Sequence, residues 1–564
     1  MKKLIGAATC ALIAVQLLPG SVAEATRPIG RLVHVASYDS GSGETGSEIV
    51  AYDERTRTML VTNGAENRID IVSIADPAAP SLLRSVALST YGISVQSVAT
   101  YKGRAVAVVA GAYTSSVASP TVLDRGAAVF FDISTGAVRG TVPTGVLPDG
   151  VAWSDDGETV VIANEGEPRC VTGPSRAPTT DPLLAENPEG SVTVIELDDG
   201  PDKRELRTKV RQVGFARFNG QMASLQAAGV RVGTWPGSTV AQDLEPEYPT
   251  IVGEVAYVTL QENNAIATID LERGVVRSIT PLGLKDHAAT GNELDTSDRD
   301  GPGSGRPSVF SPVTAPVKGM FMPDAIAPVK NRGRTYLLTA NEGDTRTYFA
   351  GIDNAEVEGN DCFADEVRVG AVTLDPSSFA PADVAALTDN KNLGRLKVTS
   401  TALSKKNGAG AYTSLASFGA RSMSVWSSGG TLVWDSGSLF ERTVYAADPA
   451  NWPNTNPTSA GAPSATARYD DRSDDKGPEP EGLTVGEHKG RTYAFVGLER
   501  AGGIVVMDVT DPRSPQFVQW FTVAGDISPE GLTFVPANDV PGKAPLLLVA
   551  HEISGTTSVL RLEV

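Results

Sequence analysis

Residues 337–346 read LLTANEGDTR, and a near copy, VVIANEGEPR, occupies residues 160–169. In both copies an apolar run typical of a β-strand ends in Asn, Glu and Gly, followed by an acidic residue and, two positions later, by Arg. Weaker echoes follow four other apolar runs: residues 61–67 (VTNGAEN), 258–264 (VTLQENN), 496–503 (VGLERAGG) and 549–555 (VAHEISG). A strand that recurs with a carboxylate at its end indicates a repeat fold and predicts a ring of acidic groups.

Each copy belongs to a longer unit that opens with an acidic residue, often after Pro, and continues through three or four short strands. Units of roughly 40–50 residues with this content are typical of a β-propeller. The sequence therefore predicts an all-β fold, a single β-propeller with eight blades, and seven blades as the alternative. The count is open because the units at residues 96–133 and 417–436 are weakly marked. The fifth unit is expected to end at residues 367–374.

The last unit ends after three strands, and a lone strand is predicted near the N-terminus, at residues 30–38. We expect this strand to become the fourth strand of the last blade and to close the ring. Closure would also remove an exposed sheet edge. Short helices are expected at residues 219–229 and 380–387, each from its start and stop signals.

Composition narrows the function classes. The chain has 564 residues, a formal net charge of −19 and a pI near 4.8, which argues against a nucleic-acid surface, because such surfaces need clustered Lys and Arg. A nucleophile elbow, a zinc helix of the HExxH type and a phosphate-binding P-loop are all missing from the sequence.

The N-terminus predicts export. Residues 1–25 combine Lys2 and Lys3 with an apolar core and small residues at the cleavage positions, as in a secretory signal. The propeller is then expected over residues 26–564, with loop insertions near 170–190, 200–240, 286–312, 375–415 and 448–478. Without a transmembrane segment or a sorting tail after residue 564, we expect a periplasmic or extracellular protein. A disulfide between Cys170 and Cys362 stays an open alternative.

Strand direction predicts where the acids gather. In an antiparallel blade, the loop into the first strand and the loop between the second and third strands lie on the same face. The Pro-acid openings and the Asn-Glu signatures therefore crowd one end of the propeller axis, where Glu48 and Glu66 hold equivalent positions. The predicted metal ligands are Asp149, Glu165, Glu247, Glu262, Asp324, Glu342, Glu481, Glu499, Glu530 and Glu552.

So many like charges need protons, cations or basic side chains as compensation. Carboxylate oxygens suit calcium, or another divalent metal such as magnesium. Basic residues are interleaved with the acids: Arg169, Arg346, Arg421, Arg500, Lys285 and Lys476. The candidate catalytic groups are Arg169, Arg346, Arg421, His287 and His551. In the alternative interpretation, each Arg pairs with a Glu of a neighbouring blade and holds the ring together. The two His are then polar side chains without a catalytic role.

Several stretches carry a family resemblance, among them MPDAIA…TANEGDTR, SFGARSMSVW, RSDDKGPEPEGLTVG and SPEGLTF…HEISGTT. They resemble the secreted choice-of-anchor I proteins over nearly all of the mature chain. The family is similar to the mesenchyme-specific cell-surface glycoproteins of biomineralising animals, and several bacterial members carry an alkaline-phosphatase label. The resemblance implies an extracellular propeller with calcium or phosphate chemistry and supplies no settled catalytic residues.

Three functional hypotheses follow. The first is a metal-dependent phosphoester hydrolase, similar to alkaline phosphatase or phytase, that acts on a phosphorylated small molecule. The second is a non-catalytic, calcium-binding propeller for an extracellular matrix or mineral ligand. The third is a scaffold whose Arg–Glu pairs only hold the blades together. The oligomeric state stays open.

Overall fold

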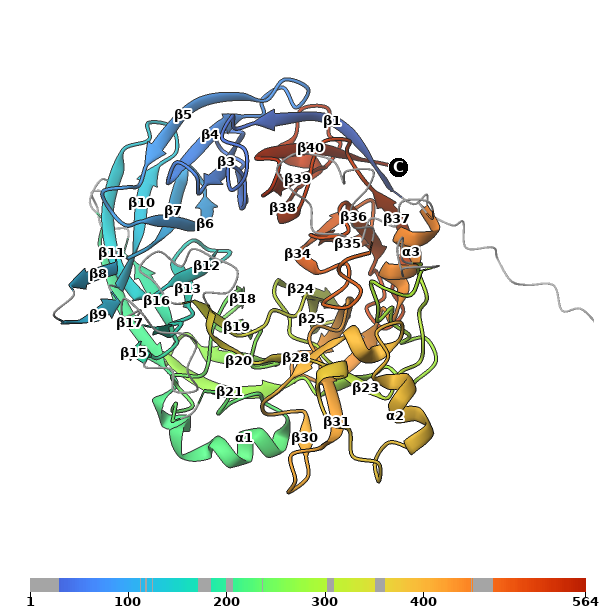
Figure 1. The fold of residues 1–564 in the computed structure, drawn as a ribbon. Coiled ribbons are helices and arrows are strands. Elements are labelled where there is room, and N and C mark those ends of the chain that lie inside the picture. The colour runs from blue at the N-terminus through green and yellow to red at the C-terminus, as the bar shows by residue number, and fades with distance from the viewer. Residues whose placement is uncertain are drawn as a thin grey trace, which may run out of the picture.

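A computed structural model describes residues 30–564 apart from 112, 117–118, 124, 171–183, 199–205, 236, 302–308, 350–360, 448 and 450–469. The predicted signal therefore lies outside the described residues. Within the described part, seven four-stranded antiparallel sheets stand in a circle around one axis (Figure 1). The innermost strand of each sheet contacts the innermost strands of the sheets beside it, so the sheets are the blades of a propeller.

Each blade runs in chain order from an innermost strand at the axis to an outermost strand at the rim. Blade 1 has β2 (Val50–Asp53), β3 (Thr58–Asn63), β4 (Arg68–Ser73) and β5 (Ser81–Ala87). Blade 2 has β6 (Ser94–Tyr101), β7 (Arg104–Ala110), β10 (Arg125–Asp132) and β11 (Val138–Val146). Blade 3 has β12 (Pro148–Trp153), β13 (Thr159–Asn164), β16 (Ser191–Leu197) and β17 (Thr208–Gly214). Blade 4 has β18 (Pro249–Val252), β19 (Val255–Leu260), β20 (Ala265–Asp270) and β21 (Val275–Pro281).

The remaining blades also run from the axis outward. Blade 5 has β24 (Ile326–Asn331), β25 (Arg334–Asn341), β32 (Ser422–Ser427) and β33 (Leu432–Asp435). Blade 6 has β34 (Pro480–His488), β35 (Arg491–Leu498), β36 (Ile504–Asp508) and β37 (Gln516–Phe521). Blade 7 has β38 (Pro529–Val535), β39 (Leu546–His551) and β40 (Thr556–Glu563), and its outermost strand is β1 (Arg31–Asp39).

The ring closes through strands from the two ends of the chain. β1 pairs antiparallel with β40, from Arg31 opposite Glu563 to Asp39 opposite Thr556, and the two strands lie side by side in Figure 1. This confirms the predicted all-β propeller and its closure by the N-terminal strand.

The blade count favoured from the sequence was wrong: the described residues form seven four-stranded sheets, which is the alternative count. The weakly marked unit at residues 417–436 is the outer half of blade 5, because β32 pairs with β25. Residues 342–421 are inserted between these two strands. Residues 367–374 therefore do not form the third strand of this blade.

Part of the insertion joins two strands that precede blade 5 in an extra sheet. This sheet runs in the order β22 (Leu284–Asp286), β23 (Val317–Met320), β31 (Tyr412–Ser417), β29 (Lys397–Thr399) and β28 (Glu366–Arg368), with β30 (Lys405–Lys406) paired to β31. Three hairpins project from the blades: β8 (Tyr113–Ser116) with β9 (Ser119–Leu123), β14 (Arg169–Cys170) with β15 (Leu184–Glu186), and β26 (Thr347–Phe349) with β27 (Asp361–Ala364).

Helices are few. The two expected short helices are present as α1 (Met222–Ala228), preceded by a 3-10 turn at Ala216–Gln221, and α2 (Pro381–Leu387). A third, α3, spans Leu439–Ala447, and further 3-10 turns lie at Val369–Ala371, Leu393–Arg395 and Ala537–Asp539. Among the described helices, none has the length and apolarity needed to cross a bilayer.

The core is divided among the spaces between blades. One apolar cluster, for example, joins Val161 and Val194 of blade 3 to Ala256 and Val258 of blade 4, and similar clusters join the other neighbouring pairs. Each blade is therefore buried on both faces, which explains why middle strands such as β3 are buried at every position. This packing explains why the middle strands are continuous apolar runs, and not runs in which apolar and polar residues alternate.

Candidate functional site: an acidic ring at one end of the axis

The innermost strands of three blades bulge at an acidic residue. The register against the second strand shifts between Pro148 and Val151, between Pro480 and Leu483, and between Pro529 and Leu532. Those shifts place Asp149, Glu481 and Glu530 in the bulges. A β-bulge re-aims the side chains at its position, and bulges are frequent beside functional sites.

Blade 2 has the same shift, between Val95 and Ser97, and there the position belongs to Gln96. The other blades place an acid just before the innermost strand: Glu48, Glu247 and Asp324. The bulge thus explains the pattern of Pro, acid and Gly at the blade openings. Blade 2 has the bulge but lacks the acid.

Glycine after the acid lets neighbouring blades touch. The N–H of Gly150 donates to the carbonyl oxygen of Glu247, at 3.1 Å. A Cβ atom at Gly482 would lie 1.8 Å from the carbonyl oxygen of Glu530. Only a residue without a side chain fits such an approach.

The residue before each of four opening prolines or acids has a left-handed backbone. Leu147, Met322, Glu479 and Ser528 have φ angles of +48°, +47°, +51° and +64°. Outside glycine, this conformation is strained and clusters at functional sites. The strain recurs at equivalent places around the axis, which marks this end of the propeller.

The Asn and Glu of the repeated signature have different roles. Asn341 donates to the hydroxyl groups of Ser422 and Ser424, at 3.1 and 2.8 Å, and so ties the second strand of its blade to the third. Asn164 bonds Thr193 in the same way, at 3.1 Å. The Asn is therefore structural, and the Glu that follows it faces the acids of the innermost strands.

We call this set of carboxylates the acidic ring. It comprises Glu48, Asp149, Glu165, Glu247, Glu262, Asp324, Glu342, Glu481, Glu499, Glu530 and Glu552. The structure thus brings together all ten predicted metal ligands and adds Glu48. Glu66, at the matching place in blade 1, is instead exposed and pairs with Arg68 at 3.8 Å.

Burial and mutual repulsion raise the pKa values of the ring. Burial, followed by the charge of Glu552, raises the pKa of Glu48 to about 8. Burial raises the pKa of Asp149 to about 7 and that of Glu499 to about 8. Burial, then Glu262 and Asp324, holds the pKa of Glu247 well above its usual range. The basic groups of the protein therefore do not neutralise all of these carboxylates, and the ring binds protons or cations favourably.

Three ring members have a carboxylate oxygen without a hydrogen-bond partner among the described residues. Glu247 and Glu262 are 8% and 7% exposed, and in each the Oε2 atom lacks a partner. Glu481 Oε2 shares this property. Unpaired oxygens inside a cluster of carboxylates fit a hard cation, because such ions bind oxygen ligands.

The predicted arginines are bound to other groups. Arg346 lies deep beside the ring, where its Nε donates to Glu245 at 3.0 Å and its Nη1 to Thr234 at 2.6 Å. Arg421 donates to the backbone oxygen of Asp295 and to Glu441, both at 2.7 Å. Both guanidinium groups are almost fully buried. Arg346 of blade 5 pairs with Glu245 before blade 4, as the structural alternative expects, whereas Glu441, the partner of Arg421, follows the last strand of the same blade.

The two predicted histidines are buried. His287 Nδ1 lies 2.7 Å from the carbonyl oxygen of Asn292, and burial lowers the pKa of this imidazole to about 3. His551 Nε2 lies 3.1 Å from Ser558 Oγ, and burial lowers its pKa to about 4. Both imidazoles are thus neutral near pH 7.

Arg169 and the two cysteines form a separate group. The backbone of Arg169 and Cys170 lies in β14, and that of Cys362 lies in β27. Their side chains are outside the described part of the structure. β14 contacts β26, the strand paired with β27, and the disulfide stays a prediction.

Sequence reasoning missed four ring neighbours. Gln261 donates to Glu342 Oε2 at 2.7 Å, and Glu479 lies beside Glu342 and Glu499. Asp243 and Glu245 receive Arg346. The run PEPE at residues 478–481 was a signal for Glu479, because it places two acids at one blade opening.

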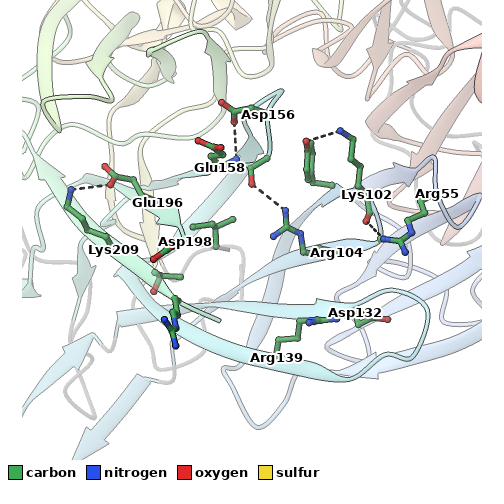
Figure 2. A pocket seen from close by; sticks show the side chains of 16 residues that line it. Arg55, Lys102, Arg104, Asp132, Arg139, Asp156, Glu158, Glu196, Asp198 and Lys209 are labelled. Atoms are coloured by element: carbon green, nitrogen blue, oxygen red, sulfur yellow. Dashed lines mark hydrogen bonds and ion pairs between the residues drawn. The ribbon is translucent and has the colours of Figure 1, made fainter. Parts of the chain in front are cut away.

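Another candidate site lies at the opposite ends of the strands. A groove of about 910 Å³ between blades 2 and 3 is lined by residues of both charges (Figure 2). Arg139 pairs with Asp132 at 2.7 Å and Lys209 with Glu196 at 3.1 Å, so many of its charges neutralise one another. The acidic ring, with its unpaired oxygens, is the stronger candidate site.

Two solved structures resemble the chain distantly. The chain is similar to a hydrazine synthase chain from Kuenenia stuttgartiensis, with a TM-score of 0.41 and 11% identity, over 92% of this chain and 96% of that one. It is also similar to the Cps50 (Swd1) β-propeller domain from Myceliophteria thermophila, with a TM-score of 0.42 and 7% identity, over 94% and 100%. The propeller assignment rests on the order of the sheets.

Two relatives share more sequence. The mesenchyme-specific cell surface glycoprotein of Strongylocentrotus purpuratus is 28% identical over 54% of this chain and 41% of its own length. Gigasin-3a of Magallana gigas is 28% identical over 30% of this chain and 64% of its own length. The matches span less than two thirds of either relative. The profile of the choice-of-anchor I domain matches residues 48–512, most of the propeller, and the chain belongs to the choice-of-anchor I family.

Proposed function

We propose that this chain is an exported binding propeller whose acidic ring holds divalent cations, with calcium as the expected ion. The observation that supports the proposal best is the pair of buried carboxylates, Glu247 and Glu262, with one unpartnered oxygen each among the described residues. A buried polar group without a partner is costly, and a bound cation removes that cost.

The ligand chemistry favours calcium over softer metals. The ring offers carboxylate oxygens from six of the seven blades, and backbone carbonyl oxygens lie in the same bulges. Calcium accepts six to eight oxygen ligands in flexible geometry, whereas zinc in structural sites prefers sulfur and nitrogen. Glu165, Glu247, Glu262 and Asp324 are the residues that would hold the ion.

Two observations support a location outside the cytoplasm. Residues 1–25 have the pattern of a secretory signal. One relative is named as a cell surface glycoprotein. The ligand class expected for a cation-dependent propeller there is an anionic matrix or mineral surface.

Metal analysis of the purified protein, paired with thermal melting, tests the proposal. Calcium should co-purify or bind after dialysis, and chelator should lower the melting temperature, because an ion that binds only the folded state stabilises it. An ion-free protein whose melting temperature is the same in calcium and in chelator would refute a cation-binding ring.

A metal-dependent phosphoester hydrolase is the second candidate, and one observation favours it. Arg500 lies 2.9 Å from Glu499 in the ring and keeps 26% of its side chain exposed, so it could hold an oxygen of a phosphate beside a cation. Phosphomonoester hydrolysis that requires calcium and is lost in R500M would support this candidate. Calcium binding without hydrolysis would support the binding propeller instead of the hydrolase.

A further inference from the structure

A charged segment carries a lysine into the acidic ring. Residues 470–479, which we call the strap, lead directly into β34. Lys476 Nζ lies 3.1 Å from Glu342, 2.9 Å from Asp344 and 3.3 Å from Glu479. The ammonium group is thus surrounded by carboxylates that follow β25 of blade 5 and by one of the strap itself, and its side chain is only 9% exposed.

Other contacts fix the strap in place. Arg421 donates to the backbone oxygens of Ser473 and Asp475, at 2.8 and 2.9 Å. Asp474 pairs with Arg395 at 2.6 Å, and Asp475 with Lys397 at 3.1 Å. These acids therefore neutralise bases of the inserted segment, whereas Lys476 and Glu479 of the strap lie against ring carboxylates.

The carboxylates around Lys476 have the spacing of a cation site. Glu342, Glu479 and Glu499 are all buried, and one oxygen from each lies within 4.8 Å of the others. Ligand oxygens on opposite sides of a calcium ion lie about 5 Å apart, since each calcium–oxygen distance is about 2.3–2.6 Å. The ammonium group bonds two of these three carboxylates.

The ring carboxylates differ in how many basic or polar groups they bond. Beside Lys476, both oxygens of Glu342 are bonded, one by the lysine and one by Gln261. Glu479 is bonded by Arg472, Lys476 and Arg500. Glu247 and Glu262, and also Glu481 beside Glu499, keep unpartnered oxygens among the described residues.

We propose that Lys476 is a built-in cation, which occupies the place of a divalent ion among Glu342, Glu479 and Glu499. It leaves exchangeable ions to the ring carboxylates that keep an unpartnered oxygen, which are Glu247, Glu262 and Glu481. The second statement rests on the proposed function, and the first stands without it. Lys476 therefore sets how many ions the ring accepts.

The number of bound ions tests this inference. Replacement K476M keeps the length of the side chain and removes its charge, so the variant should bind one more calcium ion per chain than the wild type. Calorimetric titration of dialysed protein with calcium, checked by metal analysis after gel filtration, measures the difference. K476R retains the charge and should match the wild type.

K285M is the matched control. Lys285 is also buried and paired, at 2.9 Å from Asp435, but its other partners are the backbone oxygens of Ala420 and Gly437. It should lose stability without gaining an ion. An equal ion number in K476M and the wild type would overturn the inference.

Folding of K476M gives a second readout. Three buried carboxylates without their lysine should destabilise the variant in chelator, and calcium should restore its melting temperature more than it raises that of the wild type. A variant that stays unfolded in calcium as in chelator would also overturn the inference. A wild type without ions beside a K476M variant with one ion would refute only the proposed function.

Discussion

The N–H of Gly531 in the last blade donates to the carbonyl oxygen of Glu48 in the first, at a distance of 2.9 Å. This bond joins the backbone beside Glu530 of the last blade to that of Glu48 in the first. A Cβ atom at Gly531 would lie 2.6 Å from that oxygen and 2.7 Å from the Cα of Ile49, so backbone occupies the space on this side.

Gly531→Ala should therefore destabilise the fold. Backbone atoms cannot yield as the end of a flexible side chain does, and overpacking of this kind costs about 1–3 kcal/mol. Gly214→Ala is the control, because nothing lies within 4 Å of a Cβ there, and its effect should stay within about 0.5 kcal/mol. Denaturant unfolding measures both. Equal stability of the two variants would contradict the tight approach.

Stability without cations should fall as the pH rises. The pKa values of Glu48 and Asp149, about 8 and about 7, lie above their usual values of 4.5 and 3.8. Over the interval between the ordinary and the raised values, the folded chain binds more protons than the unfolded chain. This contribution is present at low pH and is lost as the pH passes through 7 to 8.

Thermal melting in chelator between about pH 6.5 and pH 9 checks the direction, above the range in which the buried His287 and His551 titrate. Calcium should flatten the dependence, because it binds the ionised carboxylates and displaces their protons. A melting temperature that rises over this interval in chelator would contradict the raised pKa values.

Glu262→Gln should weaken the effect of calcium. The substitution keeps the shape of the side chain and removes the charge beside Glu247. At a calcium concentration 100 times Kd, binding stabilises a folded protein by about 2.7 kcal/mol, and this gain should shrink in the variant. Glu66→Gln changes the exposed equivalent of blade 1 and should respond to calcium as the wild type does. An undiminished response in E262Q would place the ion elsewhere.

Arg346→Met should be strongly destabilising. The guanidinium is buried between Asp243 and Glu245, at 3.3 and 3.0 Å. Its removal leaves these two buried carboxylates without this cationic partner. Breaking a buried pair in this way costs about 3–5 kcal/mol. The exposed pair of Arg513 with Asp511 is the comparison, and R513M should cost at most about 1 kcal/mol. Similar unfolding free energies for the two variants would count against the structural role of Arg346.

The sequence was sufficient for the features that repeat. Apolar runs such as residues 337–340 predict middle strands, and the Pro-acid openings predict the innermost ones. The antiparallel order of a blade then places both kinds of acid at one end of the axis. For that reason the members of the acidic ring were predictable without any coordinates.

Features that depend on distant partners were not predictable. Arg346 finds Asp243, 103 residues away, because the loop before blade 4 folds over the start of β26. Blade 5 is completed by a strand beyond the insertion of residues 342–421, and a local pattern assigns the nearer apolar run instead. Lys476 contacts Glu342, which lies 134 residues earlier in the chain, and no local sequence pattern shows this pairing.

Closure by β1 and β40 also sets an order of events during synthesis. Of the strands of the propeller, β1 leaves the ribosome first and β40 leaves last. Six blades can gain their neighbours as the chain lengthens, whereas β1 waits for β40 across the whole length of the propeller. Contacts of such long range form slowly, and unpaired edges invite aggregation in the meantime. Pairing of β1 with β40 is therefore the last step in the assembly of the ring, and the growing chain depends on protection of β1 until then.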